Sequence, residues 1–125
     1  MQRPLEGVRV LEVAQFTFVP AAGAVLADWG AEVIKVENPV TGDAQRGLVK
    51  VLGNAVTAPG SSFAPIMEAP NRGKRSIGLG LTTAEARPIL EELIRRSDVF
   101  LTNYLPDVRV KLRIDVEDVL ACQPL

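Results

Sequence analysis

Two apolar runs near the N-terminus flank an alanine-rich stretch, and this pattern predicts a strand, a helix and a second strand. Residues 8–13 are β-branched and nearly continuous in apolar character, as in a buried strand. Residues 21–29 predict a helix, with Pro20 at its first position and Gly30 as its left-handed cap. Residues 32–37 predict the second strand. A strand, a helix and a strand within about 30 residues form a βαβ unit with parallel strands.

A second strand–helix–strand pattern occupies the C-terminal half of the chain. Residues 76–81 alternate small and apolar side chains and predict a third strand. Residues 98–102 predict a fourth strand that ends at Asn103 and Pro106, and a weaker helix is expected over residues 116–122.

Helical spacing of apolar residues predicts the helix between these two strands. Thr82 and Glu85 have the spacing of a capping box at its start. Pro88 then lies either within the first turn or at a kink, because a proline inside a helix costs about 3 kcal/mol. The apolar positions are Ala86, Ile89, Leu90, Leu93 and Ile94.

The segment between the two halves has no clear periodicity. Residues 38–46 are expected to form a loop, and residues 47–70, with Gly-Asn and Pro-Gly-Ser-Ser turn signals, an irregular and mobile excursion. The order β-α-β, excursion, β-α-β predicts an α/β fold, an open parallel sheet with Rossmann-like winding. Two firm helices leave part of such a sheet uncovered, so residues 1–125 are expected to be the amino-terminal part of a larger domain.

Composition narrows the function classes. The chain has 125 residues, 47% of them hydrophobic, and its 14 basic against 15 acidic residues give no excess for binding nucleic acid. It has no histidine, the commonest general base, and one cysteine, Cys122, which excludes an internal disulfide and favours a reducing compartment. Glu12 and Gln15 interrupt the only long apolar stretch, so we expect no membrane span and a cytoplasmic protein.

Ligands of open α/β sheets bind outside the carboxyl ends of the strands. Polar residues follow three of these ends: residues 15–18, Glu37 with Asn38, and Asn103 with Tyr104. Residues 14–20 contain no Gly-x-Gly-x-x-Gly, so the turn does not favour a dinucleotide even though Glu37 is placed like a ribose-binding acid. The basic residues 71–75 fit either a phosphate contact or a solvated turn.

Other side chains have two interpretations each. Tyr104 suits stacking on a purine or an ordinary surface position, and Asn103 suits a ligand contact or the end of a strand. Cys122 fits a small buried hydrophobe better than a nucleophile. Asp28, Asp43 and Asp98 show no spacing that would divide acid and base roles between two carboxylates, so no catalytic residue is predicted.

Five motifs, in order along nearly the whole chain, resemble the start of class III CoA-transferases, the family of formyl-CoA and carnitine CoA-transferases and α-methylacyl-CoA racemases. The motifs are residues 4–12 (PLEGVRVLE), residues 27–37 (ADWGAEVIKVE), Gly42-Asp43-x-x-Arg46, residues 71–77 (NRGKRSI) and residues 98–106 (DVFLTNYLP).

The resemblance implies a Rossmann-like large domain that binds CoA, in a protein roughly three times this length. It also implies an interlocked homodimer, an acyl-CoA and a carboxylic acid as substrates, and no metal. Transferases of this family use an aspartate that carries the acyl group and CoA through covalent intermediates. That aspartate would lie beyond residue 125, so this chain alone is expected to be inactive.

CoA contacts of the family would map to strand ends and to one cation in this chain. These residues are Gln15, Thr17, Phe18, Asn38, Leu79, Gly80, Leu81, Thr82, Asn103, Tyr104 and Lys111. Three positions depart from the family pattern: Asn38 replaces a common arginine, Gly80 a common aspartate, and Arg113 a glycine. The first change would weaken a phosphate or adenine contact, and Gly80 loosens a strand end.

Two other functions remain open at this point. The parent protein could be an acyl-CoA racemase, whose catalytic groups would also lie beyond residue 125. The chain could instead be a truncated, non-catalytic module that binds CoA or dimerises.

Overall fold

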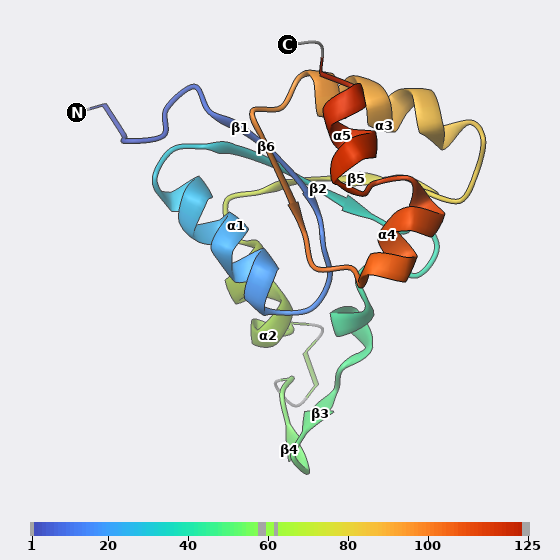
Figure 1. Cartoon of the computed structure of the whole chain (residues 1–125). Coiled ribbons are helices and arrows are strands. Elements are labelled where there is room, and N and C mark those ends of the chain that lie inside the picture. The colour runs from blue at the N-terminus through green and yellow to red at the C-terminus, as the bar shows by residue number, and fades with distance from the viewer. Residues whose placement is uncertain (1, 58–59, 62, 124–125) are drawn as a thin grey trace.

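The computed structural model describes residues 2–57, 60–61 and 63–123, and a four-stranded sheet with helices on both faces forms its centre (Figure 1). The strands are β1 (Arg9–Val13), β2 (Glu32–Glu37), β3 (Lys50–Val51), β4 (Asn54–Ala55), β5 (Arg75–Gly78) and β6 (Val99–Thr102). The helices are α1 (Phe18–Asp28), α2 (Pro65–Glu68), α3 (Ala86–Arg95), α4 (Pro106–Leu112) and α5 (Val116–Ala121). Short 3-10 turns cover Ala44–Gly47 and Ala69–Asn71.

The central sheet is parallel throughout and has the strand order β5-β2-β1-β6. Strand β1 lies inside it, paired with β2 from Arg9↔Glu32 onward and with β6 from Val10↔Val99 onward. The predicted α/β class and parallel sheet are therefore confirmed, as are the boundaries of β2 and, within one residue, those of β1 and β6.

Alternate residues of β1 point to two different layers. Leu11 and Val13 pack on the face covered by α3 and α5, whereas Val10 packs on the face covered by α1 (Figure 1). The larger core cluster contains Leu11, Val13, Val36, Leu79, Ala86, Leu90, Ile94 and Ile114. The smaller one contains Val10, Ala27, Ala31 and Val33. Glu12 and Lys35 lie between the sheet and α1, where the buried polar network described below begins.

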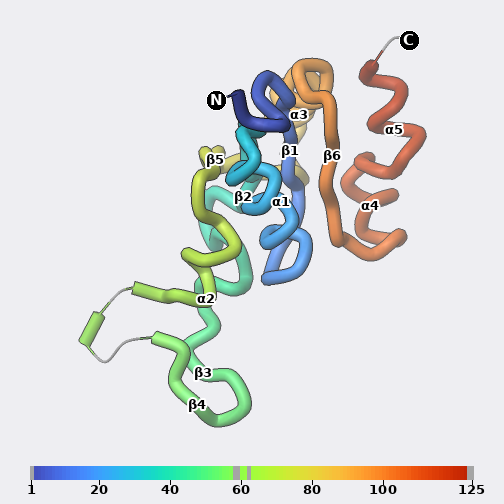
Figure 2. Tube along the Cα trace, turned by 90° about the vertical axis from the view of Figure 1, so that its left-hand side faces the viewer, coloured from blue at the N-terminus to red at the C-terminus, as the bar shows by residue number. Residues whose placement is uncertain are grey.

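The segment predicted to be irregular contains a small hairpin. Strands β3 and β4 pair antiparallel through Leu52 and Gly53, whose φ angles of 50° and 81° suit a tight two-residue turn. This hairpin projects away from the central sheet (Figure 2). A short helix, α2, follows at residues 65–68, so the expectation of an irregular excursion was wrong for these two parts. Pro59 and Ser62 of the predicted turn signal lie outside the described residues.

Helix boundaries differ from the expectation at several points. Helix α1 begins at Phe18, so Pro20 lies in its first turn rather than at its first position. Gly30 has the predicted positive φ, 106°. Pro88 falls in the first turn of α3, which was one of its two expected places. Among the described residues no helix is long and apolar enough to cross a membrane.

Two further expectations were wrong. The capping box at Thr82 and Glu85 does not form, because α3 begins at Ala86 and Thr83 instead donates its hydroxyl to the Gly80 carbonyl at 3.0 Å. Helix α4 was not expected, since Pro106 was interpreted only as the end of a strand. In the structure Pro106 is the first residue of α4. Proline is tolerated at this position because the N–H of a first helical residue makes no hydrogen bond within the helix.

Candidate functional site

A cavity of about 160 Å³ lies at the carboxyl ends of β1, β2 and β5, beside Tyr104 and the end of α4. It is lined by Gln15, Val36, Glu37, Asn38, Thr41, Leu79, Leu81, Thr82, Tyr104 and Leu112. Six of the eleven residues mapped as CoA contacts are among these: Gln15, Asn38, Leu79, Leu81, Thr82 and Tyr104. Segments as far apart as residues 15 and 112 thus converge at the edge where ligands of open α/β sheets bind.

Asn103 is bound to the backbone of Gln15 and does not line the cavity itself. Its Oδ1 accepts the Gln15 N–H at 3.0 Å, and its Nδ2 donates to the Gln15 carbonyl at 2.7 Å. Both backbone groups of Gln15 are therefore satisfied by one side chain from the end of β6. This contact holds the β1–α1 turn against β6 and leaves the Gln15 side chain at the cavity.

Asn38 uses its side-chain oxygen locally. Asn38 Oδ1 accepts the N–H groups of Val40 at 2.8 Å and Thr41 at 3.1 Å, which closes a turn directly after β2. Asn38 also lines the cavity. An arginine at position 38 would place a charged guanidinium beside the cavity, so with Asn38 this wall carries less positive charge than it would with arginine.

The segment that follows β5 forms another wall of the cavity, through Leu79, Leu81 and Thr82. The Leu79 N–H donates to the Glu37 carbonyl at 2.9 Å, which continues the β2–β5 pairing beyond the strand itself. Gly80 lies between the two lining leucines, and its carbonyl accepts the Thr83 N–H at 2.8 Å. This turn places Thr82 at the cavity.

Tyr104 is half-buried beside the cavity. Burial, together with the negative charge of Asp43, raises the pKa of the Tyr104 hydroxyl. The ring therefore stays neutral at physiological pH and offers an apolar face with one polar end, which suits a planar base.

Lys111 lies at a neighbouring, more open cavity of about 380 Å³. The two cavities share the lining residues Leu81, Thr82 and Leu112, so they adjoin at one edge. Arg87 and Arg113 also line the second cavity, and Arg113 adopts a positive φ of 55° at the end of α4. Lys111 and Arg113 are both exposed, and neither forms an ion pair within the described residues.

Thr17 and Phe18 are not among the residues that line either cavity. The Thr17 hydroxyl donates to Gln45 Oε1 at 2.9 Å, and Phe18 is 91% exposed at the start of α1. The structure therefore brings nine of the eleven mapped positions to this edge, counting Gly80, Asn103 and Lys111, and leaves these two on its flank.

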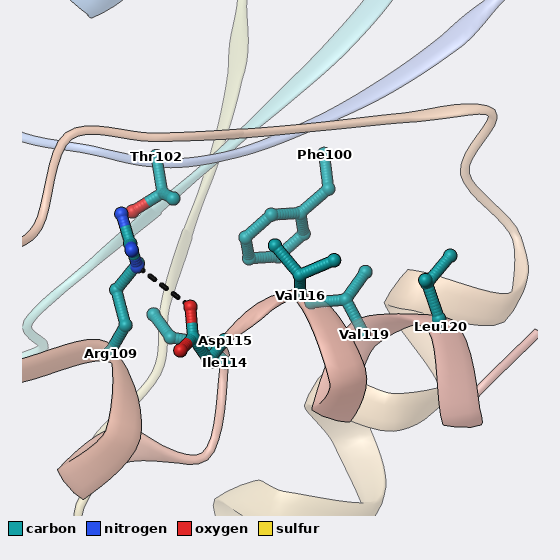
Figure 3. Close-up of a pocket in the computed structure, with 8 residues that line it drawn as sticks. All are labelled: Phe100, Thr102, Arg109, Ile114, Asp115, Val116, Val119 and Leu120. Carbon is teal, nitrogen blue, oxygen red and sulfur yellow. Dashed lines mark hydrogen bonds and ion pairs between the residues drawn. The ribbon is translucent and has the colours of Figure 1, made fainter. Parts of the chain in front are cut away.

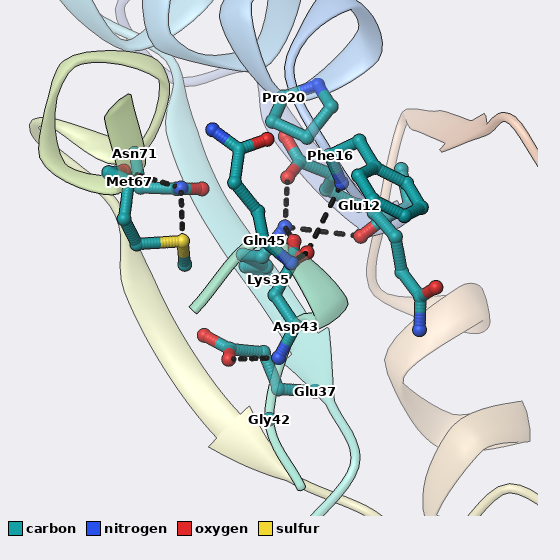
Figure 4. A network of polar contacts seen from close by, with 12 residues as sticks. Glu12, Phe16, Pro20, Lys35, Glu37, Gly42, Asp43, Gln45, Met67 and Asn71 are labelled. Carbon is teal, nitrogen blue, oxygen red and sulfur yellow. Dashed lines mark hydrogen bonds and ion pairs between the residues drawn. The ribbon is translucent and has the colours of Figure 1, made fainter. Parts of the chain in front are cut away.

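A buried network of four charges, Glu12, Lys35, Asp43 and Lys74, lies on the α1 face of the sheet; Figure 4 labels the first three. Glu12 accepts hydrogen bonds from Lys35 at 3.2 Å and from Lys74 at 2.8 Å, and Lys35 Nζ also lies 2.9 Å from Asp43 Oδ2. The carboxylates are 0% and 1% exposed, so two negative and two positive charges neutralise one another away from water.

The two lysines of this network are held by further oxygen atoms. Lys35 donates to the Ala14 carbonyl at 3.0 Å, and Lys74 to the Pro20 carbonyl at 2.8 Å and to Asn71 Oδ1 at 3.2 Å. Burial lowers the pKa of Lys74, and its hydrogen bond to Glu12 partly offsets that effect. The network was not expected from the sequence. It ties β1, β2, α1 and the turn before β5 together.

Glu37 connects this network to the cavity. It accepts Arg46 Nε and Nη2, both at 2.8 Å, and the Asp43 N–H at 2.9 Å. The Arg46 hydrogen bond lowers the pKa of Glu37, and burial opposes that shift. Asp43 and Arg46 of the Gly42-Asp43-x-x-Arg46 motif therefore both bind Glu37 at the end of β2.

This pair makes stability depend on pH in the acid range. Because the folded pKa of Glu37 lies below its usual value near 4.5, the stabilisation is complete above pH 4.5 and is lost as the pH falls through the folded pKa. We expect Glu37→Gln to lower the free energy of unfolding at pH 7, and the difference from wild type to shrink below pH 4.5. Urea denaturation at a series of pH values measures it. Glu117→Gln, an exposed charge, is the control, and a difference that is constant with pH contradicts the assignment.

A third cavity, of about 240 Å³, lies between β6 and helices α4 and α5 (Figure 3). Phe100, Val116, Val119 and Leu120 make it largely apolar, and Arg109 Nε pairs with Asp115 Oδ1 at 2.9 Å at one end. It contains none of the mapped residues. In the described ranges no three His, Cys, Asp or Glu side chains are grouped as metal ligands would be.

Comparison with known proteins identifies the family. The family model described as CoA-transferase family III matches residues 5–125. The chain belongs to this family. It is 40% identical over 121 residues to the succinate–glutarate CoA-transferase of Agrobacterium fabrum, covering 97% of this chain and 30% of that protein. It is 34% identical over 116 residues to the (R)-2-hydroxy-4-methylpentanoate CoA-transferase of Clostridioides difficile, covering 92% of this chain and 28% of that protein.

Solved structures of family III proteins have the same fold. The crystal structure of Rv3272 from Mycobacterium tuberculosis matches with a TM-score of 0.83 and 39% identity, over 98% of this chain and 32% of that one. A CAIB/BAIF family protein from Brucella suis matches with a TM-score of 0.82 and 34% identity, over 99% and 32%. The chain thus spans about a third of the length of the family III proteins that it matches.

Proposed function

We propose that this chain is the CoA-binding segment of an acyl-CoA transferase that moves CoA between carboxylic acids. The observation that carries this proposal is the convergence of Gln15, Asn38, Thr82 and Tyr104 on one cavity at the carboxyl edge of the sheet. The family III relatives reported above carry CoA-transferase names, which favours transfer over racemisation.

The chemistry of the two adjoining cavities suits the nucleotide end of CoA. The Tyr104 ring supplies a face for the adenine, and the Leu79 and Leu81 side chains supply apolar walls. Lys111 and Arg113 in the adjoining cavity supply positive charge for phosphate oxygens. The absence of a glycine-rich turn at residues 14–20 is compatible with this mode, since here side chains rather than close backbone approach would meet the phosphates.

The acyl-carrying aspartate of the parent protein would lie beyond residue 125. The carboxylate would attack the acyl-CoA to form a mixed anhydride and release CoA thiolate, which then attacks the enzyme's carbonyl to give an enzyme–CoA thioester and the free donor acid. The acceptor carboxylate would attack this thioester to form a second mixed anhydride, and the released CoA thiolate attacks the acceptor's acyl carbon, which gives the new acyl-CoA and regenerates the enzyme carboxylate. An acyl-CoA, a free carboxylic acid and an interlocked homodimer of the longer protein belong to this proposal.

Titration of the purified chain with CoA by calorimetry tests the proposal, with the mass measured by light scattering on the same sample. Saturable binding by a folded chain supports it. Absence of binding in a sample whose circular dichroism shows folded α/β structure contradicts the claim that this segment forms the CoA site.

Tyr104→Ala is expected to weaken CoA binding by about 1–2 kcal/mol, a rise in Kd of about 5- to 30-fold, because an aromatic face on the adenine is lost. Tyr104→Phe keeps the ring and is expected to bind within about twofold of wild type. Calorimetry with both variants measures the difference. Equal affinities of wild type and Tyr104→Ala would reject the adenine position.

We expect the purified 125-residue chain to have no CoA-transferase turnover, because the proposed mechanism needs a carboxylate outside it. The assay follows the exchange of CoA between an acyl-CoA and an isotopically labelled carboxylic acid by mass spectrometry. The same mixture without protein is the control, and product above that background would show that a carboxylate within this chain carries the acyl group.

A further inference from the structure

The turn that follows β1 contains a strained residue. Phe16 has a φ of +66°, in the left-handed region that side chains other than glycine and asparagine rarely adopt. The Phe16 side chain does not explain this conformation, since it is 49% exposed and is absent from the lining of the cavity. A conformation of this kind persists only where surrounding contacts impose it.

Asp43 supplies a contact that imposes it. Asp43 Oδ1 accepts the Phe16 N–H at 3.0 Å and the Gln45 N–H at 2.9 Å (Figure 4). The neighbouring residue, Gln15, is bound through both backbone groups by Asn103. The peptide group between Gln15 and Phe16 is therefore held at both ends, its carbonyl by Asn103 from β6 and its N–H by Asp43 from the loop after β2.

Asp43 is itself rigidly placed. Its side chain is buried, and its N–H donates to Glu37 Oε2 at 2.9 Å. Arg46 in turn binds the Glu37 carboxylate. Asp43 Oδ2 accepts no hydrogen bond from the described residues and faces Lys35 Nζ at 2.9 Å as an ion pair. The buried charge network therefore fixes the carboxylate that fixes Phe16.

We propose that Asp43 is a positioning residue for the ligand cavity, which acts by holding Phe16 in its left-handed conformation and thereby the Gln15 side chain at the cavity wall. The inference rests on the proposed CoA-binding function. It gives the Gly42-Asp43-x-x-Arg46 motif a role in ligand binding without contact between the motif's aspartate and the ligand.

The test compares CoA affinity and local amide exchange in Asp43→Ala, Asp43→Asn and a matched surface variant, Asp28→Ala. Asp43→Ala removes the acceptor of the Phe16 N–H, and we expect the Kd for CoA to rise about tenfold and the Phe16 amide to exchange faster. Asp43→Asn keeps an acceptor oxygen and is expected to bind more tightly than Asp43→Ala. Asp28, half-exposed and paired with Arg72, is expected to change neither measurement when replaced by alanine.

A second pair of variants tests the backbone conformation without touching the buried charges. Phe16→Asn is expected to bind CoA within about twofold of wild type, because asparagine tolerates the left-handed region. Phe16→Val is expected to weaken binding about tenfold, because a β-branched residue does not tolerate it. Both variants remove the same half-exposed ring, so lost packing cannot account for a difference between them.

The outcomes separate this inference from the function on which it rests. Folded wild-type protein that binds no CoA overturns the proposed function. Wild type that binds CoA, with Asp43→Ala, Phe16→Asn and Phe16→Val all binding equally well, overturns the role of Asp43 alone. Weaker binding by Asp43→Ala and by Phe16→Val, with Phe16→Asn unaffected, supports it.

Discussion

Gly23→Ala is expected to destabilise the protein by about 3 kcal/mol, although alanine is the better helix former by about 1 kcal/mol. Gly23 faces the sheet from the middle of α1. A Cβ atom there would overlap Glu12 Oε2 and lie 3.2 Å from Lys74 Cε. A flexible side chain would ordinarily move aside, but Glu12 is fully buried and its oxygen atoms are bound by two lysines. Urea denaturation gives the free energy of unfolding.

Gly47→Ala is the matched control for this effect. No atom lies within 4 Å of the Cβ that it would add, and Gly47 does not adopt a positive φ. It is therefore expected to be neutral or to stabilise by about 0.4–1 kcal/mol through reduced freedom of the unfolded chain. Equal stabilities of Gly23→Ala and wild type would mean that α1 moves away from the sheet at little cost.

Glu12→Gln is expected to cost about 3–5 kcal/mol, because it leaves two buried lysines with one buried carboxylate, Asp43. The glutamine is nearly the same size, so the loss is one of charge rather than of packing. Thermal or urea unfolding at pH 7 measures it. Asp28→Asn, which removes an exposed carboxylate paired with Arg72, is expected to cost less than about 1 kcal/mol.

A double variant distinguishes a charge effect from general damage. Lys74→Met alone leaves Glu12 with Lys35 and is also expected to destabilise. In the double variant with Glu12→Gln, one lysine, Lys35, faces one carboxylate, Asp43, and the charges balance again. The loss of unfolding free energy in the double variant should therefore be clearly smaller than the sum of the losses in the two single variants. Additive costs would show that Glu12 and Lys74 do not act as a pair.

The strands could be predicted because their apolar runs are short, β-branched and bounded by turn residues, but the buried charges within them could not be interpreted from the pattern. Glu12 and Lys35 each interrupt an otherwise apolar strand, and either one looks like an ordinary solvated position. The signal was the register: the two residues are direct partners in the β1–β2 pairing. Opposite charges facing each other inside two buried parallel strands indicate an ion pair under a helix.

The position of the candidate cavity could be predicted, but the contacts that hold its walls could not. The rule that ligands bind at the carboxyl ends of parallel strands placed Gln15, Asn38 and Tyr104 correctly at one edge of the sheet. The conformation of Phe16 was not predictable, since no glycine or asparagine marks that turn. Helix α4 was not predicted because a proline after a strand can mark either the end of that strand or the first residue of a helix, and Pro106 was interpreted only as the former.

The position of β1 inside the sheet has a consequence for synthesis on the ribosome. Arg9, at the start of β1, bonds to Asp98, 89 positions further along the chain. At a translation rate of about 5–20 residues per second, β1 waits roughly 5–20 s, and the completed β1–β2 pair roughly 3–12 s, before β6 emerges. During that interval the β6-facing edge of β1 has unpaired N–H and C=O groups on a strongly apolar strand, a template for pairing with another nascent chain. Slow translation between residues 38 and 98 would lengthen that exposure and lower the yield of folded protein.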